Sequence, residues 1–166
     1  MKKAIILEKM TSVFFYLFLI FTLVFFWMTL TTVLAKSSMD YAYTINGLKI
    51  EGPISIPMKI AIGISVFSGI LLVYALYLFR ENTRLFVKKK FFSLKVITNF
   101  HNIGICLISY SLIQFFIYFV FYAVSETKAT SYHFKLYGLL YGFFFFVIAD
   151  IFKLAKQEEE ENKLTI

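Results

Sequence analysis

The side chains that could do chemistry are few in this sequence and lie far apart. Asp150 is the only acid within an apolar run, and Gln114 lies in the middle of another. Such groups could line a polar path for an ion or a small solute. Asp150, however, lies about two residues from the end of its run, within reach of Lys153 or lipid headgroups, and an intramembrane amide usually hydrogen-bonds across helices. We expect structural roles for both, with a small transporter or channel as the alternative.

Histidine, cysteine and serine side chains form no recognisable catalytic group. His101 and His133 fall on opposite sides of the membrane, if the side that is richer in lysine and arginine is cytoplasmic. Cys106 is the only cysteine. Zinc needs three or four ligands, and a nucleophilic serine needs a nearby base. We therefore expect no catalytic residue, no metal, no cofactor and no enzyme.

Four apolar stretches must position these side chains, and each can cross a bilayer. They cover about residues 12–35, 58–79, 102–124 and 136–152. At about 1.5 Å per residue, each spans or nearly spans the hydrocarbon core, which is roughly 30 Å thick. Unbroken apolar runs exclude the alternating pattern of a membrane barrel. With 60% hydrophobic residues, the chain is predicted to be all-α, a single integral membrane four-helix bundle over residues 1–166.

The N-terminus resembles a signal peptide. Lys2 and Lys3 precede a long apolar run that ends in the small-residue sequence Val33-Leu34-Ala35. That run exceeds 20 residues, which is longer than the apolar region of a signal peptide. We expect an uncleaved membrane anchor.

Lysine and arginine are distributed unequally between the two sides of these spans. Twelve of the 17 fall in the N-terminal segment, in the connection 80–101 and in the tail. Basic residues accumulate on the cytoplasmic side of membrane proteins. Both termini are therefore predicted to be cytoplasmic in a bacterial inner membrane, and the net charge of +7 indicates attraction to anionic lipid rather than to nucleic acid.

The two longer connections carry local structural signals. Tyr43–Ile45 and Leu48–Ile50 flank Asn46-Gly47, a pair typical of a tight hairpin turn, so a short extracytoplasmic hairpin is expected. On the cytoplasmic side, Ser93 can cap an amphipathic helix that enters the third span. We expect the apolar side of this helix to lie against the membrane interface.

The cytoplasmic connection and the tail are the predicted interaction surface. The acidic run of the tail could pair with the basic connection and clamp the two together in a salt-sensitive contact, and Glu159 and Lys163 have the spacing of a helical ion pair. The candidate residues are Arg80, Arg84, Lys88, Lys89, Lys90 and Lys95 in the connection, and Glu158, Glu159, Glu160 and Glu161 in the tail.

Small residues recur at intervals of four in two of the spans. Gly138 and Gly142 form one such pair, and Ala61, Ser65 and Gly69 form a second series. Small residues let helix backbones approach closely in lipid. We favour packing within one bundle, with a homo-oligomer as the alternative.

The tail and the loop resemble those of a bacterial four-span membrane family known as domain of unknown function twenty-nine seventy-five. The resemblance is sharp from Asn162 to Ile166, and in Phe91-Phe92-Ser93 followed by Ile103-Gly104. Lys90 stands where a glycine often precedes the phenylalanine in that family, so the resemblance does not fix the turn geometry of the loop.

The resemblance implies four spans, no assigned catalytic residue and a frequent association with a small helix-turn-helix regulator. We therefore predict a membrane protein that contacts lipid and a cytosolic partner. Its expected role is binding, regulation or self-protection through the cytoplasmic loop and tail.

Overall fold

The computed structural model describes residues 2–34, 43–45, 48–50, 56–124 and 137–164, and it is built from four long helices. They are α1 (Lys2–Leu34), α2 (Ile56–Val87), α3 (Leu94–Val124) and α4 (Tyr137–Leu164). All four are long and apolar enough to cross a membrane, over Ala4–Thr31, Lys59–Val87, Leu94–Val120 and Tyr137–Lys163. The chain is therefore a multi-pass, all-α membrane protein. The helices are longer than the predicted spans, because polar residues next to the apolar runs are helical as well.

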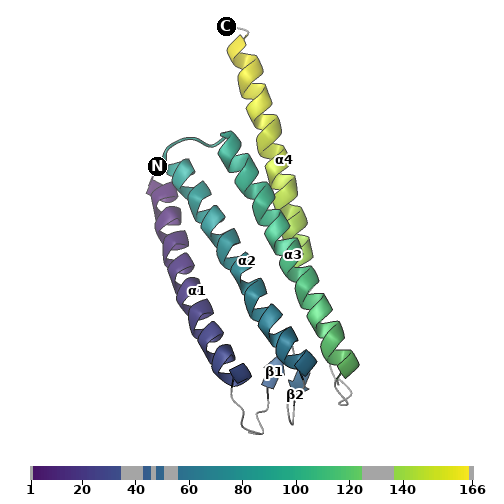
Figure 1. Ribbon diagram of the computed structural model, residues 1–166. Helices are drawn as coiled ribbons and strands as arrows, with labels where there is room; N and C mark the ends of the chain where they lie inside the picture. The colour runs from purple at the N-terminus through teal and green to yellow at the C-terminus, as the bar shows by residue number, and fades with distance from the viewer. Residues whose placement is uncertain (1, 35–42, 46–47, 51–55, 125–136, 165–166) are drawn as a thin grey trace.

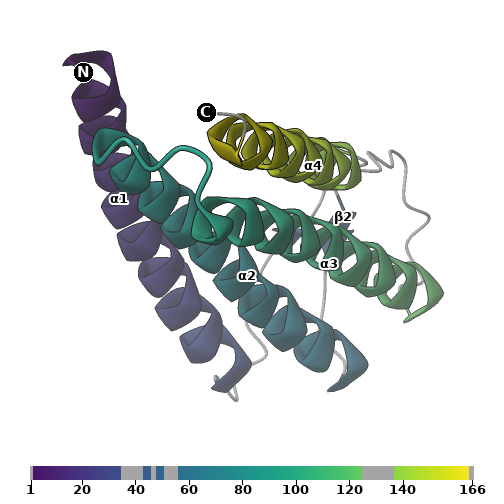
Figure 2. The ribbon, with the colours of Figure 1, turned by 90° about the horizontal axis from the view of Figure 1, so that it is seen from above.

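Each helix packs against the next one along the chain, which gives the bundle an open shape. The backbones of α1 and α2, of α2 and α3, and of α3 and α4 lie side by side, whereas no other pair of these helices has backbones in contact. Figure 2 shows α1, α2 and α3 in a row, with α4 against α3. No described residue of α1 is buried, so this helix is the one most exposed to lipid.

The start of α1, the connection between α2 and α3, and the end of α4 lie at the same end of the bundle, called the basic end below (Figure 1). The opposite end carries β1 (Tyr43–Ile45) and β2 (Leu48–Ile50), which pair antiparallel with Thr44 opposite Lys49. This pairing confirms the predicted hairpin strands. The Asn46-Gly47 turn lies outside the described residues.

The hydrophobic core lies among α2, α3 and α4. Its buried members are Ala75, Leu78, Val96, Phe100, Ile103, Cys106 and Ala149. Two aromatic side chains of α4 reach across α3 to α2: the ring centroid of Phe145 lies 6.3 Å from that of Phe79, and the centroid of Phe152 lies 6.0 Å from that of Phe86. These contacts hold α4 where its backbone does not touch α2.

The amphipathic helix begins where the sequence predicts, and it is the first part of α3. Ser93 Oγ accepts a hydrogen bond from the Val96 amide at 3.4 Å, which caps the helix. The predicted contact with the membrane interface is wrong, however, because Val96, Phe100 and Ile103 are buried in the core. An apolar helix face can pack equally well against lipid or against neighbouring helices. Here α2 and α4 cover it.

Candidate functional site

Polar side chains join α1 to α2 at the basic end. The Glu8 carboxylate lies 3.4 Å from Arg84 Nε, and the hydroxyls of Thr11 and Thr83 lie 3.1 Å apart. One helical turn farther from the basic end, Arg80 donates from Nε to Ser12 Oγ at 2.9 Å and from Nη2 to the Tyr16 hydroxyl at 3.1 Å. We call this row of contacts the polar seam; it comprises Glu8, Thr11, Ser12, Tyr16, Arg80, Thr83 and Arg84.

A buried pair of amides joins α2 to α3 at the same level. Asn99 Nδ2 donates to Asn82 Oδ1 at 2.8 Å, and Asn82 Nδ2 donates to the Val96 carbonyl at 3.4 Å. Asn82 is fully buried and Asn99 is 6% exposed. A good hydrogen bond between two such groups stabilises the bundle chiefly because either group would be unsatisfied without the other.

Ion pairs complete the network at the protein surface. Glu81 accepts from Lys95 Nζ at 3.1 Å and from Arg84 Nη1 at 3.4 Å. Arg80, Arg84 and Lys95 of the predicted interaction surface therefore contribute to contacts between helices.

Most of this network is not predicted from the sequence. Its signal was present, because Arg80-Glu81-Asn82-Thr83-Arg84 is a run of five polar residues that ends an apolar helix. Five consecutive residues cover every side of an α-helix. The run therefore faces α1, α3 and the surface at once.

The connection after α2 begins with a tight helix cap. The Lys89 amide donates to the Phe86 carbonyl at 3.0 Å, and the Lys90 amide donates to the Leu85 carbonyl at 2.9 Å. These two bonds form a Schellman motif, whose turning residue has a positive φ angle and is usually glycine. Here that residue is Lys89, with φ 58°.

Replacing Lys89 by glycine is expected to stabilise the protein. A residue with a Cβ in the left-handed region costs about 1 kcal/mol relative to glycine. We expect Lys89→Gly to raise the free energy of unfolding by about that amount in an SDS titration of the protein in detergent micelles. Lys88→Gly, at a neighbouring position where φ is not positive, should have no such gain; equal stabilisation by both would contradict the assignment.

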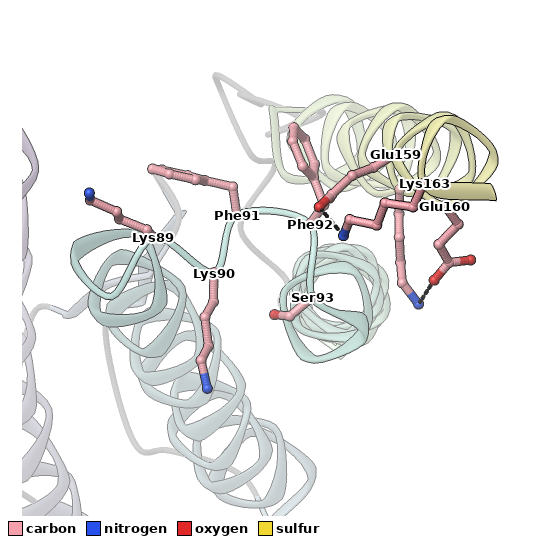
Figure 3. Close-up of a pocket in the computed structure, with 9 residues that line it drawn as sticks. Lys89, Lys90, Phe91, Phe92, Ser93, Glu159, Glu160 and Lys163 are labelled. Carbon is pink, nitrogen blue, oxygen red and sulfur yellow. Dashed lines mark hydrogen bonds and ion pairs between the residues drawn. The ribbon is translucent and has the colours of Figure 1, made fainter. Parts of the chain in front are cut away.

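A hollow of about 430 Å³ lies between this connection and α4 (Figure 3). We call it the loop–tail hollow. Its lining comprises Lys89, Lys90, Phe91, Phe92 and Ser93 from the connection, and Lys156, Glu159, Glu160 and Lys163 from α4.

Two acids of α4 pair with lysines of their own helix. Glu159 Oε1 lies 2.6 Å from Lys163 Nζ, which confirms the ion pair predicted from their spacing, and Glu160 Oε1 lies 3.1 Å from Lys156 Nζ. Lys89 and Lys90 are exposed and make no ion pair with any described residue. The contact that holds the connection to α4 is aromatic, with the ring centroids of Phe92 and Phe152 5.7 Å apart. Glu159 and Glu160 therefore do not form the expected ionic clamp.

The remaining predicted charges lie on the surface. Lys88 is exposed beside the helix cap, and Glu158 and Glu161 are exposed on α4. Figure 1 shows the end of α4 extending beyond the other helices at the basic end.

The two polar residues considered for a transport path are not brought together. Gln114 Nε2 donates to Ser68 Oγ at 2.8 Å and to Ser65 Oγ at 3.3 Å, which links α3 to α2. It also lines a cavity of about 330 Å³ with residues of α1 and α2, including Thr22 and Gly69. Asp150 is exposed on α4 and lines neither this cavity nor the loop–tail hollow.

The small residues lie at contacts between helices of the same chain. A Cβ added to Gly142 would lie 2.9 Å from the Gly104 carbonyl oxygen, and one added to Gly138 would clash with Ser111, both on α3. In α2, Ala61 is buried, Ser65 contacts Gln114 of α3, and Gly69 faces Thr22 of α1.

Among the residues that the structure describes, no three His, Cys, Asp or Glu side chains come close enough to hold a metal ion. What the basic end does bring together is a set of cations, exposed aromatic rings and a hollow. Such a set can bind an anionic or aromatic group, whereas the polar seam and the buried amides hold the helices that carry it.

Comparison with known proteins identifies one family. The family model described as "Protein of unknown function (DUF2975)" matches residues 38–166, which contain α2, α3 and α4 but not α1. No curated protein and no solved structure matches the chain.

Proposed function

Since this chain belongs to the DUF2975 family, whose description assigns no activity, we propose from its geometry that it binds an acidic segment of a cytosolic protein in the loop–tail hollow. The role is regulatory or self-protective rather than enzymatic. The protein resides in the bacterial cytoplasmic membrane, with the basic end in the cytoplasm. The helix-turn-helix regulator suggested by the family resemblance is the candidate partner.

The orientation is supported by the charges at the two ends. Twelve of the 17 basic residues belong to the segments at the basic end, and cytoplasmic loops are enriched in lysine and arginine. The start of α1 and the end of α4 lie at this end as well (Figure 1). With this orientation, the loop–tail hollow faces the cytoplasm and is accessible to a cytosolic partner.

The observation that carries the binding function is the composition of the connection. Lys89 and Lys90 have no ion pair among the described residues, and next to them Phe91 and Phe92 are 42% and 39% exposed. Aromatic side chains that can be buried in a partner's pocket provide most of the binding energy in protein interfaces, and charges around them set specificity and association rate. Unpaired lysines beside exposed rings favour an acidic segment with an apolar anchor.

The transporter alternative lacks comparable support. A polar path needs several inward groups along one route. Gln114 is hydrogen-bonded to two serines, and Asp150 lies on a different helix, outside the cavity that Gln114 lines.

The test is in-cell photo-crosslinking from position 91 in the full-length protein, followed by mass spectrometry. We expect one cytosolic protein to be captured, and the double variant K89E/K90E to reduce that adduct about tenfold, because charge reversal repels an acidic segment. Lys9→Glu is the matched control, since Lys9 is exposed at the same end on α1. It should leave the adduct unchanged.

Two results would contradict this function. One is capture of only lipid or further copies of the chain from position 91. The other is a protein adduct that K89E/K90E and Lys9→Glu affect equally.

A further inference from the structure

Arg80 lies where an apolar helix meets the membrane surface. Residues 60–79 of α2 carry no charge, and this run of 20 residues covers about 30 Å, the thickness of the hydrocarbon core. Arg80 is the next residue. Its partners Ser12 and Tyr16 follow Lys9, the last charged residue before the apolar part of α1. The guanidinium is therefore the deepest cation at the basic end of these two helices.

The guanidinium of Arg80 is held in a defined orientation. Ser12 and Tyr16 each accept one of its hydrogen bonds, at 2.9 Å and 3.1 Å. The rings of Phe15 and Tyr16 lie beside it, with centroids 5.3 Å and 4.8 Å from Cζ. An arginine has five N–H donors. Two are used in these contacts, so three remain for another ligand.

No carboxylate of the described residues neutralises Arg80. The neighbouring acids are engaged elsewhere: Glu8 pairs with Arg84, and Glu81 pairs with Arg84 and Lys95. The Arg80 side chain is only partly exposed. A cation at the edge of hydrocarbon is costly without a counterion, and the described residues supply none for Arg80. An external anion can fill that role.

We propose that Arg80 binds the phosphate group of an anionic phospholipid at the basic end of the bundle. Lipid phosphates lie directly outside the hydrocarbon core, at the level that the apolar length of α2 gives to Arg80. The planar guanidinium matches two phosphate oxygens at once, which an ammonium group does not. Ser12, Phe15 and Tyr16 hold the planar guanidinium in a fixed orientation.

The test is lipid binding to the purified full-length protein in dodecyl maltoside micelles, measured by native mass spectrometry. The probes are dioleoyl phosphatidylglycerol, dioleoylglycerol, which lacks the phosphate, and inorganic phosphate. We expect phosphatidylglycerol to bind and dioleoylglycerol not to bind. Arg80→Gln should weaken phosphatidylglycerol binding about tenfold, because it removes charge-assisted hydrogen bonds.

Lys88→Gln is the matched control, since Lys88 is exposed at the same end and has no ion pair among the described residues. It should change the affinity by less than about twofold. Arg80→Lys keeps the charge but loses the planar guanidinium that binds two phosphate oxygens at once. We expect roughly threefold weaker binding of phosphatidylglycerol. This variant decides the question if Arg80→Gln does not fold.

Three outcomes would overturn the proposal. They are unchanged phosphatidylglycerol binding by folded Arg80→Gln, equal affinities of Arg80→Lys and the unsubstituted protein, and displacement of the lipid by an equimolar amount of inorganic phosphate. The last result would assign the site to a free anion. None of them bears on the loop–tail hollow, which the crosslinking experiment tests separately.

Discussion

Asn82→Ala is expected to lower the free energy of unfolding by about 3 kcal/mol. The side chain is fully buried at the α2–α3 contact. Its removal leaves Asn99 Nδ2 without the acceptor that lies 2.8 Å away, and it opens a cavity between the helices. An unsatisfied buried amide and a cavity each destabilise a packed interface. The measurement is unfolding by SDS titration in detergent micelles, followed by circular dichroism.

A double-mutant cycle separates the hydrogen bond from the cavity. Asn99→Ala should lower the free energy of unfolding by about 2 kcal/mol, and the coupling energy between Asn82 and Asn99 should be about 1 kcal/mol. Asn102→Ala is the matched control on α3, because Asn102 makes no side-chain hydrogen bond with a described residue. Its effect should stay below about 0.5 kcal/mol. A coupling energy of zero would show that the two amides do not depend on each other.

Gly142→Ala is expected to separate α4 from α3 and to lower the free energy of unfolding by about 2 kcal/mol. The added Cβ would lie 2.5 Å from Ile108 Cγ1 and 2.9 Å from the Gly104 carbonyl oxygen. The isoleucine side chain can rotate away, but a backbone oxygen in a helix cannot. The two helices therefore have to move apart, and the dispersion contacts along the whole interface weaken.

Cys106 reports this separation directly. It is the only cysteine of the chain, and it is buried in the core between α2, α3 and α4. We expect Gly142→Ala to increase the rate of Cys106 modification by a membrane-permeant thiol reagent.

Gly63→Ala is the matched control for this substitution, because a Cβ at Gly63 would meet nothing within 4 Å. It should leave Cys106 protected and stability unchanged or slightly higher. Equal labelling in both variants would contradict the close α3–α4 contact.

The interhelical polar contacts were less accessible to sequence analysis than the packing glycines. The spacing of Gly138 and Gly142 indicated a close contact, although it could not name α3 as the partner. Asn82 and Asn99 carried no comparable signal, because each is one of several polar residues near a helix end. Their pairing depends on the rotation of α2 against α3 and on the tight turn at Lys89.

Membrane insertion was determined by the sequence itself, because it depends on local quantities. An uncharged apolar run of about 20 residues spans the hydrocarbon core whatever its neighbours are. The pairing of Tyr43–Ile45 with Leu48–Ile50 is local as well, because it joins segments that are close in the sequence. Which side of each helix faces protein was decided only by the tertiary structure. Apolar side chains are equally well accommodated by lipid and by another helix, so hydrophobicity does not distinguish Phe100, which is buried, from Phe116, which is 66% exposed. The geometry of the helix contacts makes that distinction, and it also brings Arg80 to Ser12 and Tyr16 and opens the hollow between the loop and α4.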